Sequence, residues 1–385
     1  MKTLLRGLLL RLTNPALLVK AARSSSGEIK RILVIRPDHL GDLLFATPAL
    51  ARLREAFPAA HITGLVGPWG RAIWQDNPNP DTLRVVAFPG IAGDKGRNPL
   101  APYNLLRNTA RELSREKYDL GVTLRFDHWW GAALLAAAGV PRRWGYDTPG
   151  MGDWLTNMVP YRPGKHEVEQ NLALVEALIE GEHGAHIAPL EIDRNRGIPA
   201  LTPPRAIAPD LGALAGWADA PRRAIIHPGT MSSNKLWTVQ GWGEVAKQLV
   251  ADGWAVALTG SPDERPLVQA ILASANEPSL LTLVGATANI SQLAWVLGHA
   301  NLVLGVDNGP LHIADALGKE TLHLYGPSDE TIWGPWGDPQ KHRALRAPGT
   351  HPTSHLETGS PGMEGGPEMR AITVDMVMRV IDRES

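Results

Sequence analysis

Residues 31–42 read RILVIRPDHLGD, and this stretch decides the fold of the first half of the chain. The run Ile32–Ile35 is short and unbroken in its apolar character, which is typical of a strand buried on both faces of a sheet. Gly41 allows a tight turn after the strand, and we expect an amphipathic helix from there to about Ala56. A buried strand, a tight turn and a helix are the repeating unit of doubly wound parallel sheets.

This unit recurs along the chain. We expect further strands at residues 62–66, 85–88 and 120–124, with helices at 103–117 and 130–138. The pattern restarts with strands at 223–227, 254–259, 281–284, 302–306 and 321–325, and with helices at 238–252, 263–274, 290–299 and 310–317. The sequence therefore predicts an α/β protein with two Rossmann-like domains, whose ligands are expected in a cleft at the carboxyl ends of the strands.

The stretch between residues 187 and 221 is rich in Pro, Ala and Gly, and we expect the domain junction there. A Gly/Pro/Ser-rich surface loop is predicted near the end of the second domain. We divide the chain into a basic leucine-rich leader (1–27), an N-terminal Rossmann-like domain (28–205), a C-terminal Rossmann-like domain (206–368) and a final helix (369–385).

The composition is that of a globular protein of ordinary polarity. Of the 385 residues, 44% are hydrophobic and 20% are charged, and the net charge is −1, which argues against a nucleic-acid binder that relies on bulk charge. The sequence contains no cysteine, which excludes disulfides, thiolate metal sites and cysteine nucleophiles.

The leader combines basic residues with many leucines. Arg11 and Pro15 interrupt its apolar run, which makes the run too short to span a bilayer. Three interpretations stay open: a surface helix that touches anionic lipid, a frayed segment packed on the first domain, and a signal peptide.

Asp42 follows the first strand and the Gly41 turn. A carboxylate at this place can remove a proton from an attacking hydroxyl. The alternative is a helix cap that accepts hydrogen bonds from backbone N–H groups, and spacing alone favours this role. Both roles are compatible, because a helix N-terminus tends to keep a carboxylate ionised.

The second domain opens with HPGTMSSNK at residues 227–235, a strand-end loop with small hydroxyl residues and a terminal cation. Backbone N–H groups, Thr230 and Ser232 can bind a diphosphate there, and Lys235 can neutralise its charge. A solvated turn explains the same residues. The spacing of a Walker loop is absent.

Two later strand ends carry further polar groups. Glu264 can accept hydrogen bonds from a ribose diol, or it is an acid in the first turn of a helix. Residues 307–312 read DNGPLH, and the helix that Pro310 begins offers N–H groups to an anion. His312 can bind a phosphate there or be structural, and Asp307 can organise the turn.

Together these segments resemble glycosyltransferase family 9, the ADP-heptose:lipopolysaccharide heptosyltransferases. The matching segments are RPDHLGD at 36–42 with PAL at 48–50 and FP at 57–58, HPG at 227–229 with KLW at 235–237, TGS at 259–261 with Glu264, DNGPLH at 307–312 with GP at 326–327, and MRAITV at 369–374. The resemblance implies a GT-B fold and an inverting, metal-independent transfer. One departure is Asn308, which stands where the family usually has Thr or Ser.

The resemblance also implies roles for individual residues. Asp42 looks like the general base in the acceptor domain. The residues that look like the donor site in the C-terminal domain are Thr230, Lys235, Glu264, Asp307, Asn308, Gly309 and His312. Three groups, Arg142, Arg143 and His166, are candidates for an anionic lipid-linked acceptor such as the lipopolysaccharide core, or are surface charges.

The resemblance implies a nucleotide sugar, expected to be ADP-heptose, as substrate, with neither a cofactor nor a metal. We expect a cytoplasmic protein, with contact to the inner membrane if the leader binds lipid. A nucleotide-sugar epimerase on the same fold and a catalytically silent glycan-binding paralogue stay open as alternatives. An NAD-dependent oxidoreductase is disfavoured, because no G-x-G-x-x-G follows the first strand.

Overall fold

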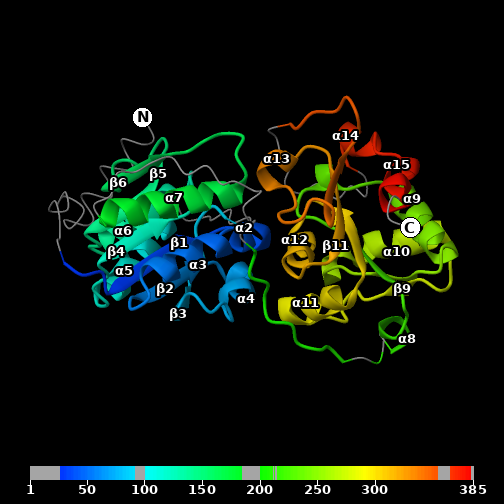
Figure 1. Ribbon diagram of the computed structural model, residues 1–385, viewed down its shortest axis with the longest axis horizontal. Coiled ribbons are helices and arrows are strands. Elements are labelled where there is room, and N and C mark those ends of the chain that lie inside the picture. Colours follow the sequence, from blue (N-terminus) through cyan, green and yellow to red (C-terminus); the bar gives the residue numbers. More distant parts are fainter. Residues whose placement is uncertain are drawn as a thin grey trace. The chain divides into compact units, whose positions relative to one another are not determined.

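The computed structural model describes residues 27–91, 100–183, 200–210, 212, 215–353 and 365–382. The chain divides into two compact units (Figure 1). The predicted leader lies outside the described residues, apart from residue 27. No helix in the described ranges is both long and apolar enough to cross a membrane.

The N-terminal unit alternates strands with helices. Its elements are β1 (Arg31–Arg36), α2 (Leu40–Phe45), α3 (Thr47–Ala56), β2 (His61–Val66), α4 (Arg71–Trp74), β3 (Thr82–Val85), α5 (Ala101–Ser114), β4 (Leu120–Thr123), α6 (Trp129–Ala137), β5 (Arg142–Asp147), β6 (Asn157–Pro160) and α7 (Glu167–Glu182).

The C-terminal unit repeats the alternation. Its elements are α8 (Ala215–Ala218), β7 (Arg223–His227), the 3₁₀ turn η5 (Ser233–Lys235), α9 (Val239–Ala251), β8 (Ala255–Leu258), η6 (Pro262–Glu264), α10 (Arg265–Ala275), β9 (Leu281–Thr282), α11 (Ile290–His299), β10 (Leu302–Val306), α12 (Gly309–Ala316), β11 (Glu320–Tyr325), α13 (Glu330–Trp333), β12 (His342–Arg346), α14 (Pro367–Arg370) and α15 (Val374–Asp382).

Both units contain a six-stranded parallel sheet with the same strand order. The order is β3-β2-β1-β4-β5-β6 in the first unit and β9-β8-β7-β10-β11-β12 in the second. In each sheet the fourth strand returns to the side of the first. The connections therefore diverge between β1 and β4 and between β7 and β10, and ligands of such sheets bind at this point. The predicted fold class of two Rossmann-like domains is confirmed.

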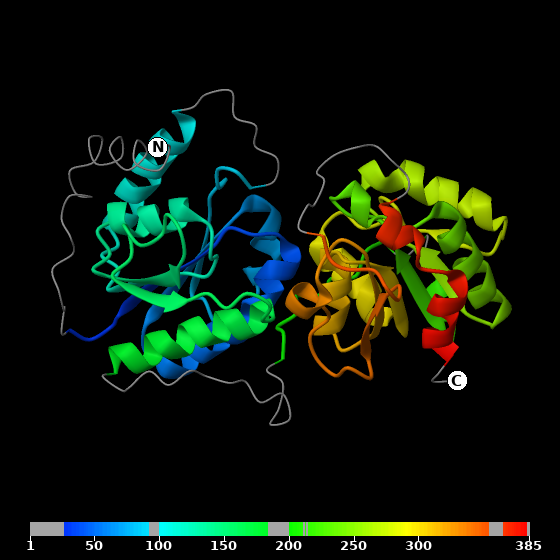
Figure 2. The same ribbon diagram turned by 90° about the horizontal axis from the view of Figure 1, so that it is seen from above.

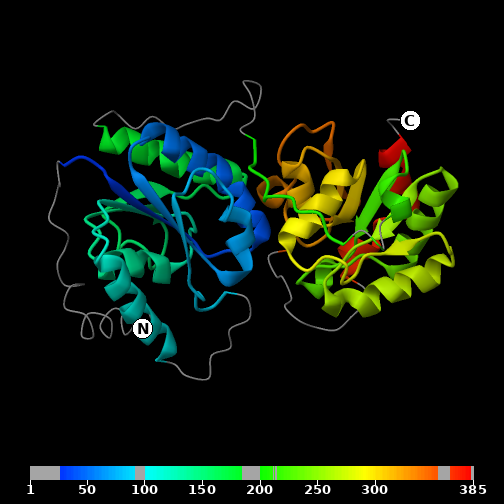
Figure 3. The ribbon, with the colours of Figure 1, turned by 90° about the horizontal axis from the view of Figure 1, so that it is seen from below.

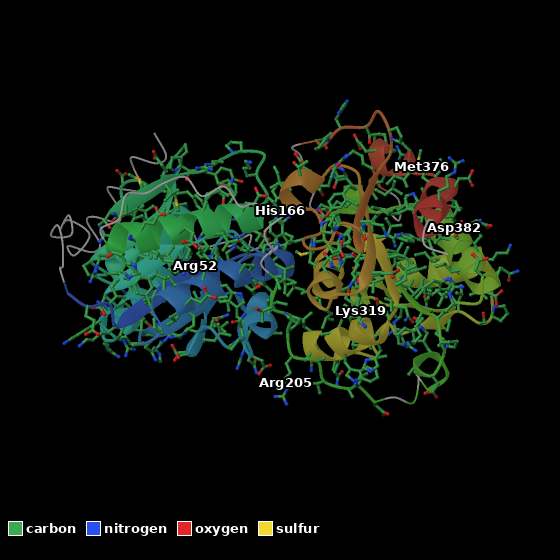
Figure 4. The ribbon with its side chains drawn as sticks, viewed as in Figure 1. Arg52, His166, Arg205, Lys319, Met376 and Asp382 are labelled. Atoms are coloured by element: carbon green, nitrogen blue, oxygen red, sulfur yellow. The ribbon has the colours of Figure 1, made fainter. Side chains whose placement is uncertain are left out.

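Helices cover both faces of each sheet (Figures 2 and 3). In the first unit α3 packs on α7 and α5 packs on α6. Arg52 of α3, labelled in Figure 4, donates to Glu176 of α7 at 2.5 and 3.2 Å. In the second unit Trp237 and Trp242 are buried in the core with their rings edge to face, which confirms the packing role that is usual for tryptophan.

Several elements differ from the sequence prediction. The third strand occupies 82–85 rather than 85–88, and the first helix is two helices, α2 and α3, that divide at Ala46 just before Pro48. The strands β5, β6 and β12 and the helix α7 were not predicted. The strands β5 and β12 read RRWGYD and HRALR, and their charged residues conceal the apolar pattern of a buried strand.

A glycine in β10 gives the fold a testable feature. A Cβ atom on Gly305 would lie 2.5 Å from the carbonyl oxygen of His227 in the neighbouring strand and 2.4 Å from the side chain of Leu311. We expect Gly305→Ala to lower the free energy of unfolding by about 1–3 kcal/mol, because backbone cannot move aside as a flexible side chain can.

The matched control is Gly298→Ala in α11, where the nearest atom, in Leu317, lies 3.9 Å from the added Cβ. This variant should keep or gain up to roughly 1 kcal/mol of stability, since alanine favours a helix. Urea denaturation followed by circular dichroism compares the two variants, and equal midpoints would contradict the close approach at Gly305.

Candidate active site

Asp42 lies where the first sheet changes direction. It belongs to the first turn of α2, which follows β1, and 24% of its side chain is exposed. The N-cap of this helix is His39, and no side-chain hydrogen bond caps the helix. The alternative role of Asp42 as a helix cap is therefore wrong. Its carboxylate lies at the carboxyl end of the sheet, 3.5 Å from the guanidinium of Arg36.

Arg36, the last residue of β1, gathers three carboxylates around one guanidinium group. Its side chain lies 2.5 Å from Asp38, 3.1 Å from Glu167 and 3.5 Å from Asp42. Arg125, which follows β4, forms a second ion pair with Asp38. Arg36 is 2% exposed, so these charges interact in a poorly solvated environment.

The position of Arg36 is fixed by two further contacts. Its guanidinium donates to the carbonyl oxygen of Leu124 at 2.5 Å and to the side-chain oxygen of Asn171 in α7 at 3.0 Å. Arg36, Glu167 and Arg125 had no role predicted from the sequence. Arg36 and Arg125 share one sequence signal, because each is a charged residue at or directly after a predicted strand. Glu167 has no such signal, since it lies 131 residues away from Arg36 in the chain.

This environment changes the acidity of Asp42. Burial and the neighbouring carboxylate of Asp38 raise the pKa of Asp42 to about 6, although Arg36 acts in the opposite direction. A carboxylate with this pKa is ionised at neutral pH and is more basic than an ordinary aspartate. These are the properties that a general base needs near its working pH.

In the second unit, the loop after β7 and the turn after β10 meet at the corresponding place in the sheet. Lys235 Nζ lies 2.7 Å from Asp307 Oδ2, and the Thr230 hydroxyl donates to the Asp307 carbonyl at 3.5 Å. Asn308 is the N-cap of α12, because its side-chain oxygen accepts from the Leu311 N–H at 3.1 Å. Its amide nitrogen donates to the carbonyl of Gly229 at 2.8 Å. These bonds hold the two loops together.

His312 is the fourth residue of α12 and has carboxylates on both sides of its ring. Nε2 is 3.6 Å from Asp307 Oδ1, and Nδ1 is 3.2 Å from Asp315 Oδ2. Burial by itself would lower the pKa of His312, but these two carboxylates raise it to about 9. Burial would likewise raise the pKa of Asp307, yet Lys235 and His312 hold it far below its usual range. Two cations, Lys235 and His312, therefore share the carboxylate of Asp307, and we call these three residues the cationic turn.

Glu264 closes the 3₁₀ turn η6, where its carboxylate accepts from the Ser261 N–H at 2.6 Å. This contact confirms the role of a first-turn acid. The carboxylate also lies 3.9 Å from His227 Nε2, at the start of the loop that holds Thr230 and Lys235. Gly309 is the first residue of α12. The seven residues predicted for the donor therefore lie on four neighbouring segments of the C-terminal unit, and their ligand contacts stay a prediction.

The three acceptor candidates have partners inside the N-terminal unit. Arg142 donates to Glu182 at 2.9 Å, and Arg143 is buried and donates to the carbonyls of Trp154 and Val140. His166 is the buried N-cap of α7, at the position labelled in Figure 4. The interpretation of these residues as surface charges is wrong, since all three belong to internal networks. Their role toward an acceptor stays a prediction.

Among the described residues, one group of potential metal ligands lies close together, namely His312, Asp315 and His323. The oxygens of Asp315 already accept hydrogen bonds, from the hydroxyl of Thr321 at 2.6 Å, from His323 at 3.0 Å and from His312 at 3.2 Å. We interpret the group as a hydrogen-bond network rather than as a metal site, because its contacts satisfy the carboxylate without an ion.

Known proteins resemble the chain in sequence. Residues 106–358 match the model of Glycosyltransferase family 9 (heptosyltransferase). Lipopolysaccharide heptosyltransferase 3 of Escherichia coli is 28% identical over 306 residues, which cover 77% of this chain and 84% of the relative. Lipopolysaccharide heptosyltransferase 1 of Pseudomonas aeruginosa is 26% identical over 332 residues, covering 81% and 83%.

Solved structures share the fold. ADP-heptose lps heptosyltransferase II of E. coli matches with a TM-score of 0.68 at 21% identity, covering 92% of this chain and 98% of that one. The E. coli heptosyltransferase WaaC with ADP matches with a TM-score of 0.67 at 20% identity, covering 92% and 100%. The fold is thus of the GT-B type, as expected. The family model matches more than half of the length of this chain. The chain therefore belongs to glycosyltransferase family 9 and is a glycosyltransferase.

Proposed function

We propose that the protein transfers a heptose from ADP-heptose to a lipopolysaccharide core acceptor, with inversion at the anomeric carbon. The names of its relatives support this substrate class. The mechanism is supported by one observation: one sheet holds a basic group at its carboxyl end and the other sheet holds positive charges at the corresponding end. One sheet end holds Asp42, a carboxylate of raised pKa, and the other holds the cations Lys235 and His312 beside a helix N-terminus.

The donor diphosphate is assigned to the N-terminus of α12. The first N–H groups of this helix, Lys235 and His312 all favour a negative charge, and the 2.7 Å contact with Asp307 holds Lys235 in place. The Thr230 hydroxyl is a further donor in the same loop. Glu264 is assigned to the ribose diol, for which a carboxylate is the usual acceptor.

The transfer is a single displacement. The acceptor hydroxyl gives its proton to Asp42 while its oxygen attacks the anomeric carbon of the heptose. The bond between that carbon and the diphosphate oxygen breaks, and its electron pair leaves with ADP. Lys235, His312 and the helix N–H groups stabilise the charge that develops on the diphosphate, and this role is the one that a metal ion has in other transferases.

The epimerase and the silent paralogue are less favoured, because the chain belongs to a transferase family and keeps both Asp42 and Lys235. For the acceptor we propose only its class, a lipopolysaccharide core. For contact with the inner membrane we propose the leader, residues 1–27.

Lys235→Ala should weaken ADP binding. The substitution removes a charge-assisted hydrogen bond to the diphosphate, which corresponds to about 1.5–3 kcal/mol of binding free energy. Isothermal calorimetry with ADP measures the loss, with Lys247→Ala on the exposed face of α9 as control. Equal affinity in Lys235→Ala and wild type would remove Lys235 from the site.

Transfer should continue in the presence of EDTA. The cationic turn and the N-terminus of α12 supply the stabilisation that a divalent ion would otherwise supply. Release of ADP is measured with and without chelator, and with added Mg²⁺. Activity that disappears in EDTA and returns with Mg²⁺ would contradict a metal-independent mechanism.

Asp42→Asn should lower turnover by roughly 10²–10⁴ while ADP affinity stays unchanged, because the amide cannot accept the proton of the acceptor hydroxyl at neutral pH. In the wild type, turnover should fall as the pH decreases through about 6, where Asp42 becomes protonated.

Both effects are measured at saturating donor and acceptor, and thermal unfolding checks that the variant is folded. A folded Asp42→Asn protein with nearly normal turnover would show that Asp42 is not the base. A turnover that is constant from pH 5 to pH 8 would show that the acidity of Asp42 does not control the reaction.

A further inference from the structure

Behind the cationic turn, α12 carries a second aspartate that sequence analysis did not assign to any role. Asp315 lies three residues after His312 on the same face of the helix, and its side chain is completely buried. It completes a continuous series of contacts that runs from Lys235 to Asp307, on to His312 and then to Asp315.

Asp315 is itself held from three directions. The Thr321 hydroxyl donates to its Oδ1 at 2.6 Å, and His323 Nε2 lies 3.0 Å from the same oxygen. His342 Nδ1, from the adjacent strand β12, is 3.4 Å away. The second oxygen, Oδ2, faces His312. The carboxylate is thus fixed by β11 and β12 with one oxygen turned toward the helix.

The arrangement determines the protons of the His312 ring. Both ring nitrogens face carboxylate oxygens, Nδ1 toward Asp315 and Nε2 toward Asp307. A nitrogen without a proton would place its lone pair against a carboxylate, which is unfavourable in a buried site. Two N–H groups avoid this, so the geometry favours the imidazolium form with a fixed ring orientation.

We propose that Asp315 is a positioning residue for the donor: it holds the His312 ring from behind and keeps it protonated, so that the ring adds a fixed positive charge at the turn that takes the donor diphosphate. This inference rests on the proposed function, since it presupposes that the diphosphate binds at this turn. Asp315 does not touch the ligand. It acts through His312, as a carboxylate behind a histidine fixes the ring in other sites.

The charges explain why the turn needs this second aspartate. Lys235 and Asp307 form an ion pair at 2.7 Å, so Asp307 compensates part of the positive charge that Lys235 offers to the diphosphate. A protonated His312 adds one positive charge, and Asp315 compensates that charge on the side away from the turn. Without Asp315, Asp307 would be the sole carboxylate to stabilise two cations.

The test compares Asp315→Asn with wild type over a range of pH. The groups that face His312 are Asp315 on its own helix, Asp307 after β10 with Lys235 behind it, and His323 on β11. His342 on β12 faces Asp315, and Tyr325 on β11 interacts with both aspartates. The asparagine keeps an oxygen that accepts from Nδ1–H but loses the charge. The pKa of His312 should therefore decrease, and the ring should lose its proton at a lower pH than in the wild type.

Calorimetry with ADP should give affinities that differ less at pH 6 than at pH 8, because a lower pH favours the protonated His312 in both proteins. At pH 8 the variant should bind roughly fivefold to tenfold more weakly, because a neutral histidine lacks the positive charge that attracts the diphosphate. The control is Asp119→Asn, which removes a carboxylate that accepts from the N–H groups of Lys30 and Arg31 in the other unit. It should bind ADP as the wild type does at both pH values.

Nuclear magnetic resonance of the histidine rings gives a second readout that needs no ligand. The His312 signal, assigned by its loss in His312→Gln, should titrate well above the ordinary histidine range in the wild type. An ordinary titration of His312 in the wild type overturns the proposal, even if Asp315→Asn fails to fold. An affinity ratio that is the same at pH 6 and pH 8 also overturns it. Failure of the wild type to bind ADP would instead contradict the proposed function, while the titration would still test the pairing of His312 with Asp315.

Discussion

The return of the fourth strand to the side of the first is the constraint on which both candidate sites depend. In each sheet it separates the loops that follow the two central strands, at the carboxyl end where backbone N–H groups and side chains face outward. Asp42 follows β1, and the DNG turn follows β10. The same topology, present in both units, thus positions the proposed base in one unit and the proposed anion site in the other.

Burial raises the pKa of Asp42 but by itself would lower that of His312. Around Asp42, burial and the carboxylate of Asp38 raise the pKa of Asp42, although Arg36 acts in the opposite direction. Around His312, two carboxylates surround a single ring and raise the pKa of the histidine. In both cases the fold supplies neighbours of the sign that favours the protonated form. The consequence differs: the aspartate becomes a stronger base, whereas the histidine becomes a permanent cation at neutral pH.

Much of this could be predicted from the sequence, because the strongest signals are local. The run 32–35 is a buried strand and the DNGPLH segment joins a strand to a helix, and both are where they were expected. The turn expected at Gly41 is instead part of α2, which begins at Leu40. The strand β5 was missed because RRWGYD has charged residues at its ends. The role of Asp42 as a cap was also wrong, since the N-cap of the helix is His39, three residues earlier.

The groups that tune the sites could not be found in the same way. Glu167 reaches Arg36 across 131 residues, and His323 reaches Asp315 from the next strand, so only the folded chain brings these charges together. Asp315 gave a weak local signal, its spacing of three residues from His312. Spacing can place a residue on a helix face but does not show which charges meet it there.

The central claim is the transfer of one heptose with inversion. The most direct measurement incubates the protein with ADP-heptose and a lipopolysaccharide core acceptor, and determines the mass of the acceptor and the anomeric configuration of the new linkage. We expect one heptose added for each ADP released, with the anomeric configuration opposite to that of the donor. Release of ADP without a gain in acceptor mass, or a product that retains the donor configuration, would contradict it.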